Sequence, residues 1–229
     1  MRIRHVVPLI TLAAAVGLGQ SIQPPNSAPA QTTTTTPPSV LQSQSQIGLT
    51  SYSEQTARTM PRALDQLAEE SVTIVHGFVI SAVVEPHPQL KNLLTVLVTM
   101  KVESTLKGAP QKTFQFRQYI WDARDRAGSA GYLKGEELLL LLGPVSQYGL
   151  RSPVGLEQGR FRILRDNKGN AVALNGRGNM GLFQSVEERA RTKGIQLSPK
   201  TTALIRTKVA GAVPLDDLKD ALITLGRTK

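Results

Sequence analysis

Hydrophobic and polar residues alternate along the middle of the chain with the period of a β-strand. From Leu94 to Val102 every second residue is apolar, and among the intervening positions only Leu97 is apolar as well. Because successive side chains of a strand point to opposite faces, this pattern predicts a strand with one buried face. It is the clearest structural signal in the sequence.

Four other segments carry strand patterns. The stretch 72–84 is rich in β-branched residues, and Phe114 and Phe116 face one way in a third strand. Residues 136–142 are apolar on both faces, which predicts a central strand. Residues 160–174 alternate on both sides of a tight turn at 166–169 and predict a hairpin.

Helices are predicted only near the ends of the folded region. A short amphipathic helix capped by Ser53 would carry one apolar side, and a second short helix at 183–193 would pair Glu187 with Arg191. The final helix runs from Pro214 to Leu225. The predicted fold is therefore mostly β, a small OB-like barrel with a short N-terminal helix and a C-terminal helix. The apolar side of the first helix would consist of Ala57, Met60, Leu64 and Leu67.

The chain divides into four predicted parts. Residues 1–19 have the basic start and apolar run of a secretory signal peptide, and residues 20–53 form a disordered linker rich in Pro, Thr, Gln and Ser. Residues 54–180 form the barrel domain, and residues 181–229 form a helical extension packed on it. Two alternatives stay open: an N-terminal segment retained as an anchor, and a glycosylated Thr/Pro stalk.

Positive charge is concentrated in the second half of the chain. The formal net charge is +10, and residues 151–208 hold twelve basic residues against four acidic ones. The candidate anion-binding residues are Arg160, Arg162, Arg165 and Lys168, with Arg160 and Arg162 on one outward strand face. The alternative is a solvated basic face. Nucleic acid is an improbable ligand, because no aromatic side chains interleave with these charges.

The sequence predicts no catalytic residue, no metal site and no cofactor. There is no cysteine, and the mature chain would hold only His76 and His87. Glu136 and Glu137 are neighbours in a strand and so point to opposite faces. The segment 176–181 fits G-x-G-x-x-G, but no acidic residue follows about 20 positions later, so we interpret it as a flexible loop.

The order of several short motifs resembles a known family. A strand with an internal glycine (Val72–Val79) precedes Leu106-Lys107-Gly108, and Gly135-Glu136-Glu137-Leu138 and residues 155–162 follow. This order resembles uncharacterised exported bacterial proteins and, more distantly, netrin-like modules on an OB-type barrel. The resemblance implies an OB-type barrel fold and an exported protein. Protease inhibition is not implied, because inhibitors of the netrin-like type depend on cysteines that this chain lacks.

These motifs also have direct structural interpretations. Gly77 is expected to mark a bulge or bend in a curved strand, and Gly108 a strand exit at positive φ. Gly135 is expected to place a turn before the buried strand.

The sequence therefore predicts an exported, non-enzymatic binding module of the cell envelope, periplasmic or extracellular, with no transmembrane span in the mature chain. Its partner would be an envelope protein or an acidic polymer of unknown identity. One alternative is the binding of an anion, either an acidic polysaccharide or nucleic acid, at the basic strand face. The other is a hydrolase with an unrecognised site in the loop from Trp121 to Asp125.

Overall fold

The computed structural model describes residues 60–121 and 126–226, all within one compact unit. The predicted signal peptide, the predicted linker and the start of the first predicted helix lie outside these residues. So does most of the loop from Trp121 to Asp125, of which only Trp121 is described.

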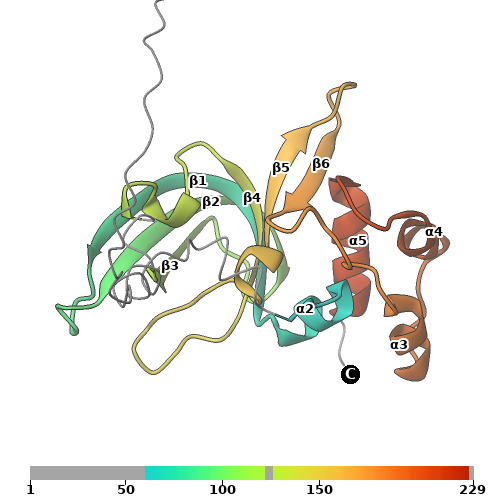
Figure 1. Ribbon diagram of the computed structural model, residues 1–229, viewed down its shortest axis with the longest axis horizontal. Helices are drawn as coiled ribbons and strands as arrows, with labels where there is room; N and C mark the ends of the chain where they lie inside the picture. Colours follow the sequence, from blue (N-terminus) through green and yellow to red (C-terminus); the bar gives the residue numbers. More distant parts are fainter. Residues whose placement is uncertain (1–59, 122–125, 227–229) are drawn as a thin grey trace, which may run out of the picture. The chain divides into compact units, whose positions relative to one another are not determined.

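A seven-stranded antiparallel sheet forms the centre of the fold, in the order β3-β2-β1-β4-β5-β6-β7 (Figure 1). The fold is mostly β, as the alternation predicted. The sheet is strongly curled, but it does not close into a barrel, so the structure bears out the mostly β fold and not the barrel that was expected. The strands are β1 (Thr73–Pro86), β2 (Leu94–Lys107), β3 (Thr113–Tyr119), β4 (Glu137–Leu142), β5 (Arg160–Arg165), β6 (Ala171–Asn175) and β7 (Val213–Pro214).

Closure fails at the outer edge of β3, which does not join another strand of the sheet. Instead, the segment that follows β4 reaches this edge. A bridge joins Arg117 to Leu150, and the Arg151 backbone N–H donates to the Arg117 carbonyl oxygen at 2.8 Å. A connecting loop therefore occupies the place that a barrel strand would take.

The curl of the sheet originates in β1, which pairs with β2 along its whole length and with β4 over its first six residues. Its register against β2 shifts between His76 and Gly77 and again between Val79 and Ser81. A Cβ atom at Gly77 would lie 2.0 Å from the Lys101 carbonyl oxygen. The bulge predicted at Gly77 is thus confirmed, and it lets the two backbones approach closely while the strand bends.

Two apolar cores lie on opposite faces of the sheet, and β4 serves both. Leu139 and Leu141 point into the core beneath the helices, while Leu138, Leu140 and Leu142 point into the core inside the curl. All five are fully buried. The prediction of a central strand that is apolar on both faces is confirmed.

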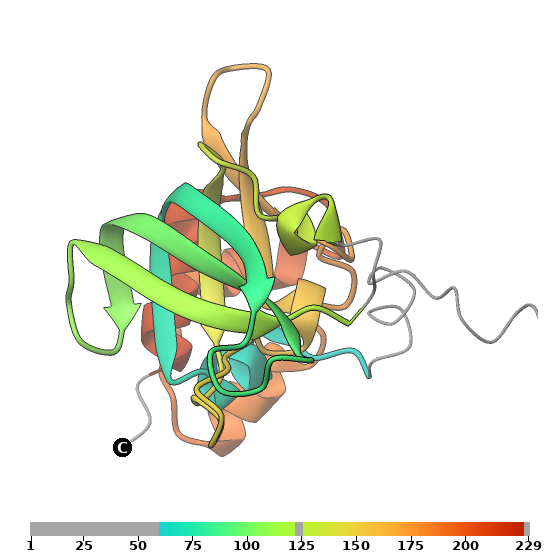
Figure 2. The ribbon, with the colours of Figure 1, turned by 90° about the vertical axis from the view of Figure 1, so that its left-hand side faces the viewer.

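The helices cover one face of the sheet (Figure 2). Leu215, Leu218, Leu222 and Leu225 of the final helix are buried there, as its spacing predicted. The helices are α2 (Leu64–Glu70), α3 (Val186–Thr192), α4 (Pro199–Thr207) and α5 (Leu215–Leu225), with short 3₁₀ turns η2 (Ser129–Gly131) and η3 (Leu156–Gln158).

Two expectations about the helices were wrong, and one helix was missed. Met60 is 80 % exposed and precedes α2, so it does not belong to the helix's apolar side. Glu187 pairs with Arg206 of α4 rather than with Arg191, because α4 packs beside α3. Helix α4 itself was not predicted.

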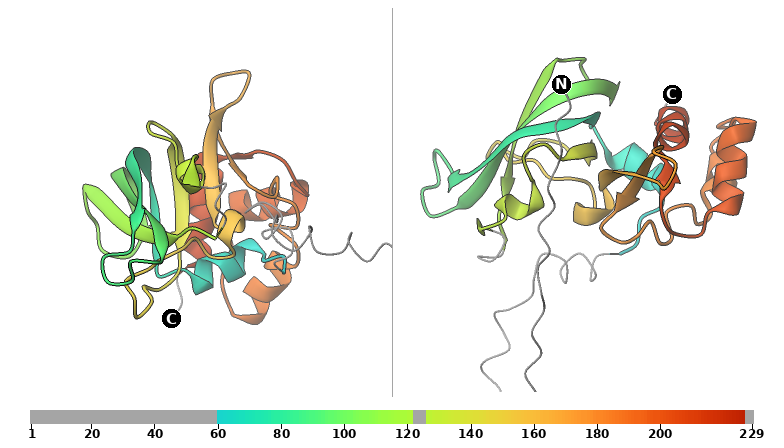
Figure 3. Two further views of the ribbon diagram at one scale, coloured as in Figure 1. Left: turned by 60° about the vertical axis from the view of Figure 1, so that its left-hand side comes forward. Right: turned by 90° about the horizontal axis from the view of Figure 1, so that it is seen from above.

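The β5–β6 hairpin projects from the body of the fold (Figure 3). Its tip is the predicted turn, in which Asp166 accepts hydrogen bonds from the backbone N–H groups of Lys168 and Asn170 at 2.8 Å. None of the helices in the described part of the chain is both long enough and apolar enough to cross a bilayer.

Candidate binding groove

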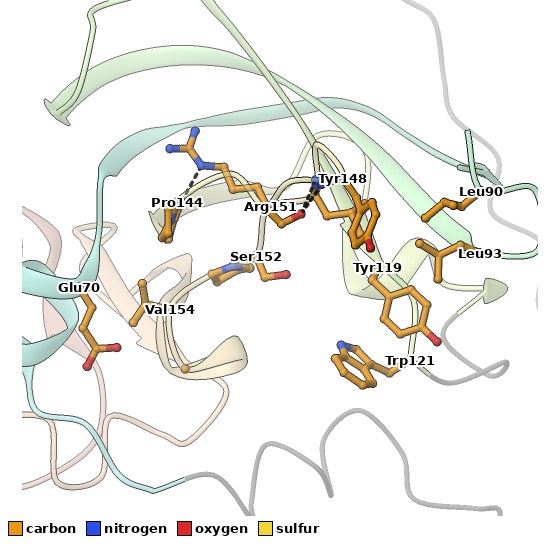
Figure 4. A pocket seen from close by; sticks show the side chains of 15 residues that line it. Glu70, Leu90, Leu93, Tyr119, Trp121, Pro144, Tyr148, Arg151, Ser152 and Val154 are labelled. Carbon is orange, nitrogen blue, oxygen red and sulfur yellow. Dashed lines mark hydrogen bonds between the residues drawn. The ribbon is translucent and has the colours of Figure 1, made fainter. Parts of the chain in front are cut away.

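An open groove of about 730 Å³ lies at one end of the curled sheet (Figure 4). Four segments that are far apart in the sequence form it: the end of α2, the β1–β2 loop, the end of β3 and the long β4–β5 connection. Its lining is largely apolar and aromatic. The lining residues used below are Glu70, Leu90, Tyr119, Trp121, Tyr148 and Arg151.

Two of the aromatic side chains lie at the end of β3 and just beyond it. Ile120 is 5 % exposed and belongs to the core inside the curl, and its backbone N–H donates to the Leu94 carbonyl oxygen at 3.1 Å. Its neighbours Tyr119 and Trp121 therefore emerge on the other side. Their ring centroids are 4.8 Å apart at an interplanar angle of 76°, an edge-to-face pair. Trp121 remains 56 % exposed.

The third aromatic side chain stands on a tight turn of the β4–β5 connection. The Ser146 backbone N–H donates to the Leu150 carbonyl oxygen at 2.8 Å, and the Ser146 hydroxyl accepts from the Leu150 N–H at 3.1 Å. Gly149 adopts a φ of +73°, which glycine tolerates best. This turn presents Tyr148 to the groove with about half of its surface exposed.

His87 ties the two loops of the groove together. Its Nε2 lies 2.7 Å from the Tyr148 carbonyl oxygen, and its Nδ1 accepts hydrogen bonds from the backbone N–H groups of Gln89 and Leu90. The two N–H donors require an unprotonated Nδ1, which assigns the proton to Nε2. His87 is only 3 % exposed, so it positions Leu90 and Tyr148 without lining the groove.

The charged residues around the groove are directed away from it or neutralised. The Arg151 guanidinium donates to the Gly143 carbonyl oxygen and to the Thr73 hydroxyl, both at 2.8 Å, and lies over the Phe114 ring. Figure 4 shows it turned from the centre of the groove. Burial lowers the pKa of this guanidinium from its ordinary value. Glu70 forms a salt bridge with Arg62 at 3.0 Å.

The four basic residues singled out in the sequence do not form one site. Arg160 and Arg162 share a face of β5, as expected, but of the two only Arg162 is exposed to solvent. Arg165 points to the opposite face, and Lys168 stands in the exposed hairpin turn. Salt bridges join Arg162 to Glu136 and Arg165 to Glu137, each at 2.9 Å.

Arg160 lies inside the fold and is 4 % exposed, contrary to the outward orientation expected. The η2 segment covers this face. The Arg160 guanidinium lies 4.8 Å over the Tyr132 ring, donates to the Ala130 carbonyl oxygen at 2.7 Å and forms a salt bridge with Glu157. Arg160 thus joins η2, η3 and the sheet.

A second polar cluster lies on the helix face of the sheet. His76 Nε2 is 2.9 Å from a Glu137 carboxylate oxygen, and its Nδ1 is 3.1 Å from the Lys219 ammonium of α5. Accepting from an ammonium requires an unprotonated Nδ1, so His76 is neutral with its proton on Nε2. Burial lowers the pKa of His76, which agrees with a neutral ring.

The sequence also raised the questions of a metal site and of the segment 176–181. Within residues 60–121 and 126–226 no group of three potential metal ligands comes together. The segment 176–181 forms consecutive turns, and Asn175 and Asn179 exchange hydrogen bonds between side-chain oxygens and backbone N–H groups. Asn179 is fully buried, so these bonds anchor the segment.

Comparisons with protein-family models, with curated proteins and with solved structures gave no match.

Proposed function

We propose that this chain is an exported, non-enzymatic binding module that holds an extended, uncharged ligand in the aromatic groove. The observation that carries the proposal is the exposure of Trp121, Tyr148 and Leu90 around one concave surface, at 56 %, 48 % and 39 % respectively. Exposed apolar side chains that gather in one concavity mark binding sites more often than scattered ones do.

The electrostatics of the groove support an uncharged ligand. The chain as a whole is strongly basic, yet Arg151 is held by Gly143 and Thr73, and Glu70 is paired with Arg62. An anionic polymer would find no free cation among these groove residues. Binding rather than catalysis is supported by the same bonds, because they engage the two charged side chains of the lining, Arg151 and Glu70, in structural roles.

An OB-type origin of the sheet is part of the proposal. In its support, β1 pairs with both β2 and β4, and the groove lies between the β1–β2 and β4–β5 loops. These are the loops with which OB-folds bind extended polymers. The kinship to netrin-like exported proteins rests on the sequence motifs, and export rests on the signal-peptide pattern of residues 1–19.

Three classes of probe test the proposal: a peptide array, an array of uncharged oligosaccharides, and heparin as the anionic polymer. The full chain is compared with Trp121→Ala and, as a control outside the groove, Met180→Ala, whose side chain is 70 % exposed. The expected result is binding to a peptide or an uncharged glycan that Trp121→Ala removes and Met180→Ala retains.

Binding to heparin alone would contradict the proposal, provided that added salt abolishes it and Trp121→Ala leaves it unchanged. That result would favour the anion-binding alternative at Arg162 and Lys168, both of which are exposed. Absence of binding to all three probes would also contradict it.

A further inference from the structure

The groove offers hydrogen-bond donors that are not engaged elsewhere. In the part of the chain that the structure describes, no hydrogen bond involves the Tyr119 hydroxyl, the Tyr148 hydroxyl or the Trp121 indole N–H. The indole N–H can only donate, and a hydroxyl donates readily. The ligand that fits these three groups presents acceptors at intervals along an apolar surface.

Apart from the Tyr119 and Tyr148 hydroxyls, which can accept as well as donate, the groove acceptors that could serve a sugar's own hydroxyl groups are largely engaged. The Ser146 hydroxyl already accepts from the backbone N–H groups of Tyr148 and Leu150, and the Ser152 carbonyl oxygen accepts from Gly143. The Glu70 carboxylate is paired with Arg62. Each sugar hydroxyl desolvated here without a partner would weaken binding, so the groove disfavours a glycan.

A polyproline II helix has the opposite chemistry and matches the groove. Proline has no backbone N–H to satisfy, while the carbonyl oxygens of this extended helix project from it as free acceptors. Aromatic grooves recognise such segments by packing proline rings against Trp and Tyr. The edge-to-face Tyr119–Trp121 pair, with its interplanar angle of 76°, supplies aromatic surfaces in two orientations against which such rings can pack.

We propose that the ligand of the groove is a proline-rich segment of a partner protein, bound as a polyproline II helix against Tyr119, Trp121 and Tyr148. This inference rests on the proposed function and names its ligand class. The partner carries little charge where it enters the groove, because the groove residues Arg151 and Glu70 are already paired. The segment has lost most of its conformational entropy before binding, which favours affinity.

The test uses the full chain and a synthetic decaproline, with a Gly-Ser decapeptide as the flexible control. Trp121 is the only tryptophan of the protein, so its fluorescence reports on the groove directly. The expected result is a saturable change of Trp121 emission with decaproline and none with the Gly-Ser peptide. Raising the salt concentration should leave the affinity nearly unchanged, since no ion pair contributes.

Variants separate the aromatic surface from the hydrogen bond, with calorimetry as the readout where Trp121 is replaced. Trp121→Ala and Tyr148→Ala should each weaken decaproline binding by about tenfold or more, as buried aromatic anchors do. Trp121→Phe keeps an aromatic face without the N–H, so its affinity for decaproline should lie between those of the original chain and Trp121→Ala. Met180→Ala should bind as the original chain does. Circular dichroism verifies the fold of each variant.

Trp121-dependent binding of an uncharged oligosaccharide such as cellohexaose, without any binding of decaproline, would overturn this inference and leave the proposed function standing. Failure of every probe would overturn both. The chain's own prolines at 24, 25, 37 and 38 supply a competing occupant. If replacing these four by alanine raised the affinity for decaproline, a separate partner would be the wrong occupant.

Discussion

The imidazole Nε2 of His76 lies 2.9 Å from a carboxylate oxygen of Glu137, across the pairing of β1 with β4. Both side chains are nearly enclosed, with 8 % and 12 % of their side-chain surface exposed. Lys219 of α5 approaches the other ring nitrogen, and Arg165 binds the second carboxylate oxygen. This row of charges and dipoles connects the last helix to the centre of the sheet.

The His76 cluster makes the stability of the fold depend on pH. The pKa of His76 is lowered from 6.5, chiefly by burial, so near and below that pH the unfolded chain binds a proton that the folded chain resists. The contribution of neutral His76 to the free energy of unfolding is complete above pH 6.5. It is lost as the pH falls toward the lowered pKa that His76 has in the folded state. Urea unfolding between pH 8 and 5 measures it. His76→Gln should flatten this dependence, and an equally steep dependence in the variant would contradict the assignment.

The close approach at Gly77 predicts a large cost for the smallest substitution. Gly77→Ala places a methyl group 2.0 Å from the Lys101 carbonyl oxygen and should lower the free energy of unfolding by about 3 kcal/mol. Gly128→Ala is the matched control, because a Cβ there meets nothing within 4 Å. Denaturant unfolding of both variants checks the difference, and equal stabilities would show that β1 and β2 separate at little cost.

Arg160 and Arg162 stand two residues apart on β5 but should differ widely in their contribution to stability. Arg160→Met leaves the Glu157 carboxylate buried without its partner and should cost about 3–5 kcal/mol. Arg162→Met breaks a half-exposed pair with Glu136 and should cost about 0–1 kcal/mol. Thermal and urea unfolding provide the comparison. Similar costs would mean that Arg160 is more solvated than its 4 % exposure indicates.

His87 should control the order of the groove more than the stability of the whole fold. In His87→Ala the backbone N–H groups of Gln89 and Leu90 lose their acceptor, and the Tyr148 carbonyl oxygen loses its donor. Amide hydrogen exchange at Gln89 and Leu90 should accelerate, while exchange in β4 should change little. Tyr148→Phe is the control, since the bond involves the backbone of Tyr148. Unchanged exchange at both amides in His87→Ala would contradict this role.

The strands and the final helix could be predicted from the sequence because their burial follows a fixed period. Leu94–Val102 and the Leu215, Leu218, Leu222 and Leu225 series each mark one buried face. Helix α4 carries a weaker apolar pattern. Its start did have a signal, because Ser198 followed by Pro199 is a typical cap and first turn, and the Ser198 hydroxyl accepts from the Thr201 N–H at 3.1 Å.

The groove could not be predicted because no local pattern contains it. Leu90, Trp121 and Tyr148 meet only after β1, β2 and β3 have paired and the β4–β5 connection has returned to the edge of β3. A partial signal was available, since the only tryptophan stands in a polar stretch where a core role is excluded. The inward orientation of Arg160 was equally hidden, because it depends on η2 covering that face of β5.

The bridge from Leu150 to Arg117 also affects how molecules of this protein meet one another. A bare border strand offers its N–H and C=O groups to any extended chain and so invites edge-to-edge aggregation. The same stretch of backbone that carries Tyr148 occupies this edge of β3 at Arg117 and so limits such pairing there. A mutation that altered the ligand preference of this loop but detached it from β3 would expose the strand edge and lower the solubility of the protein. The evolution of new ligand preferences through this loop is therefore constrained.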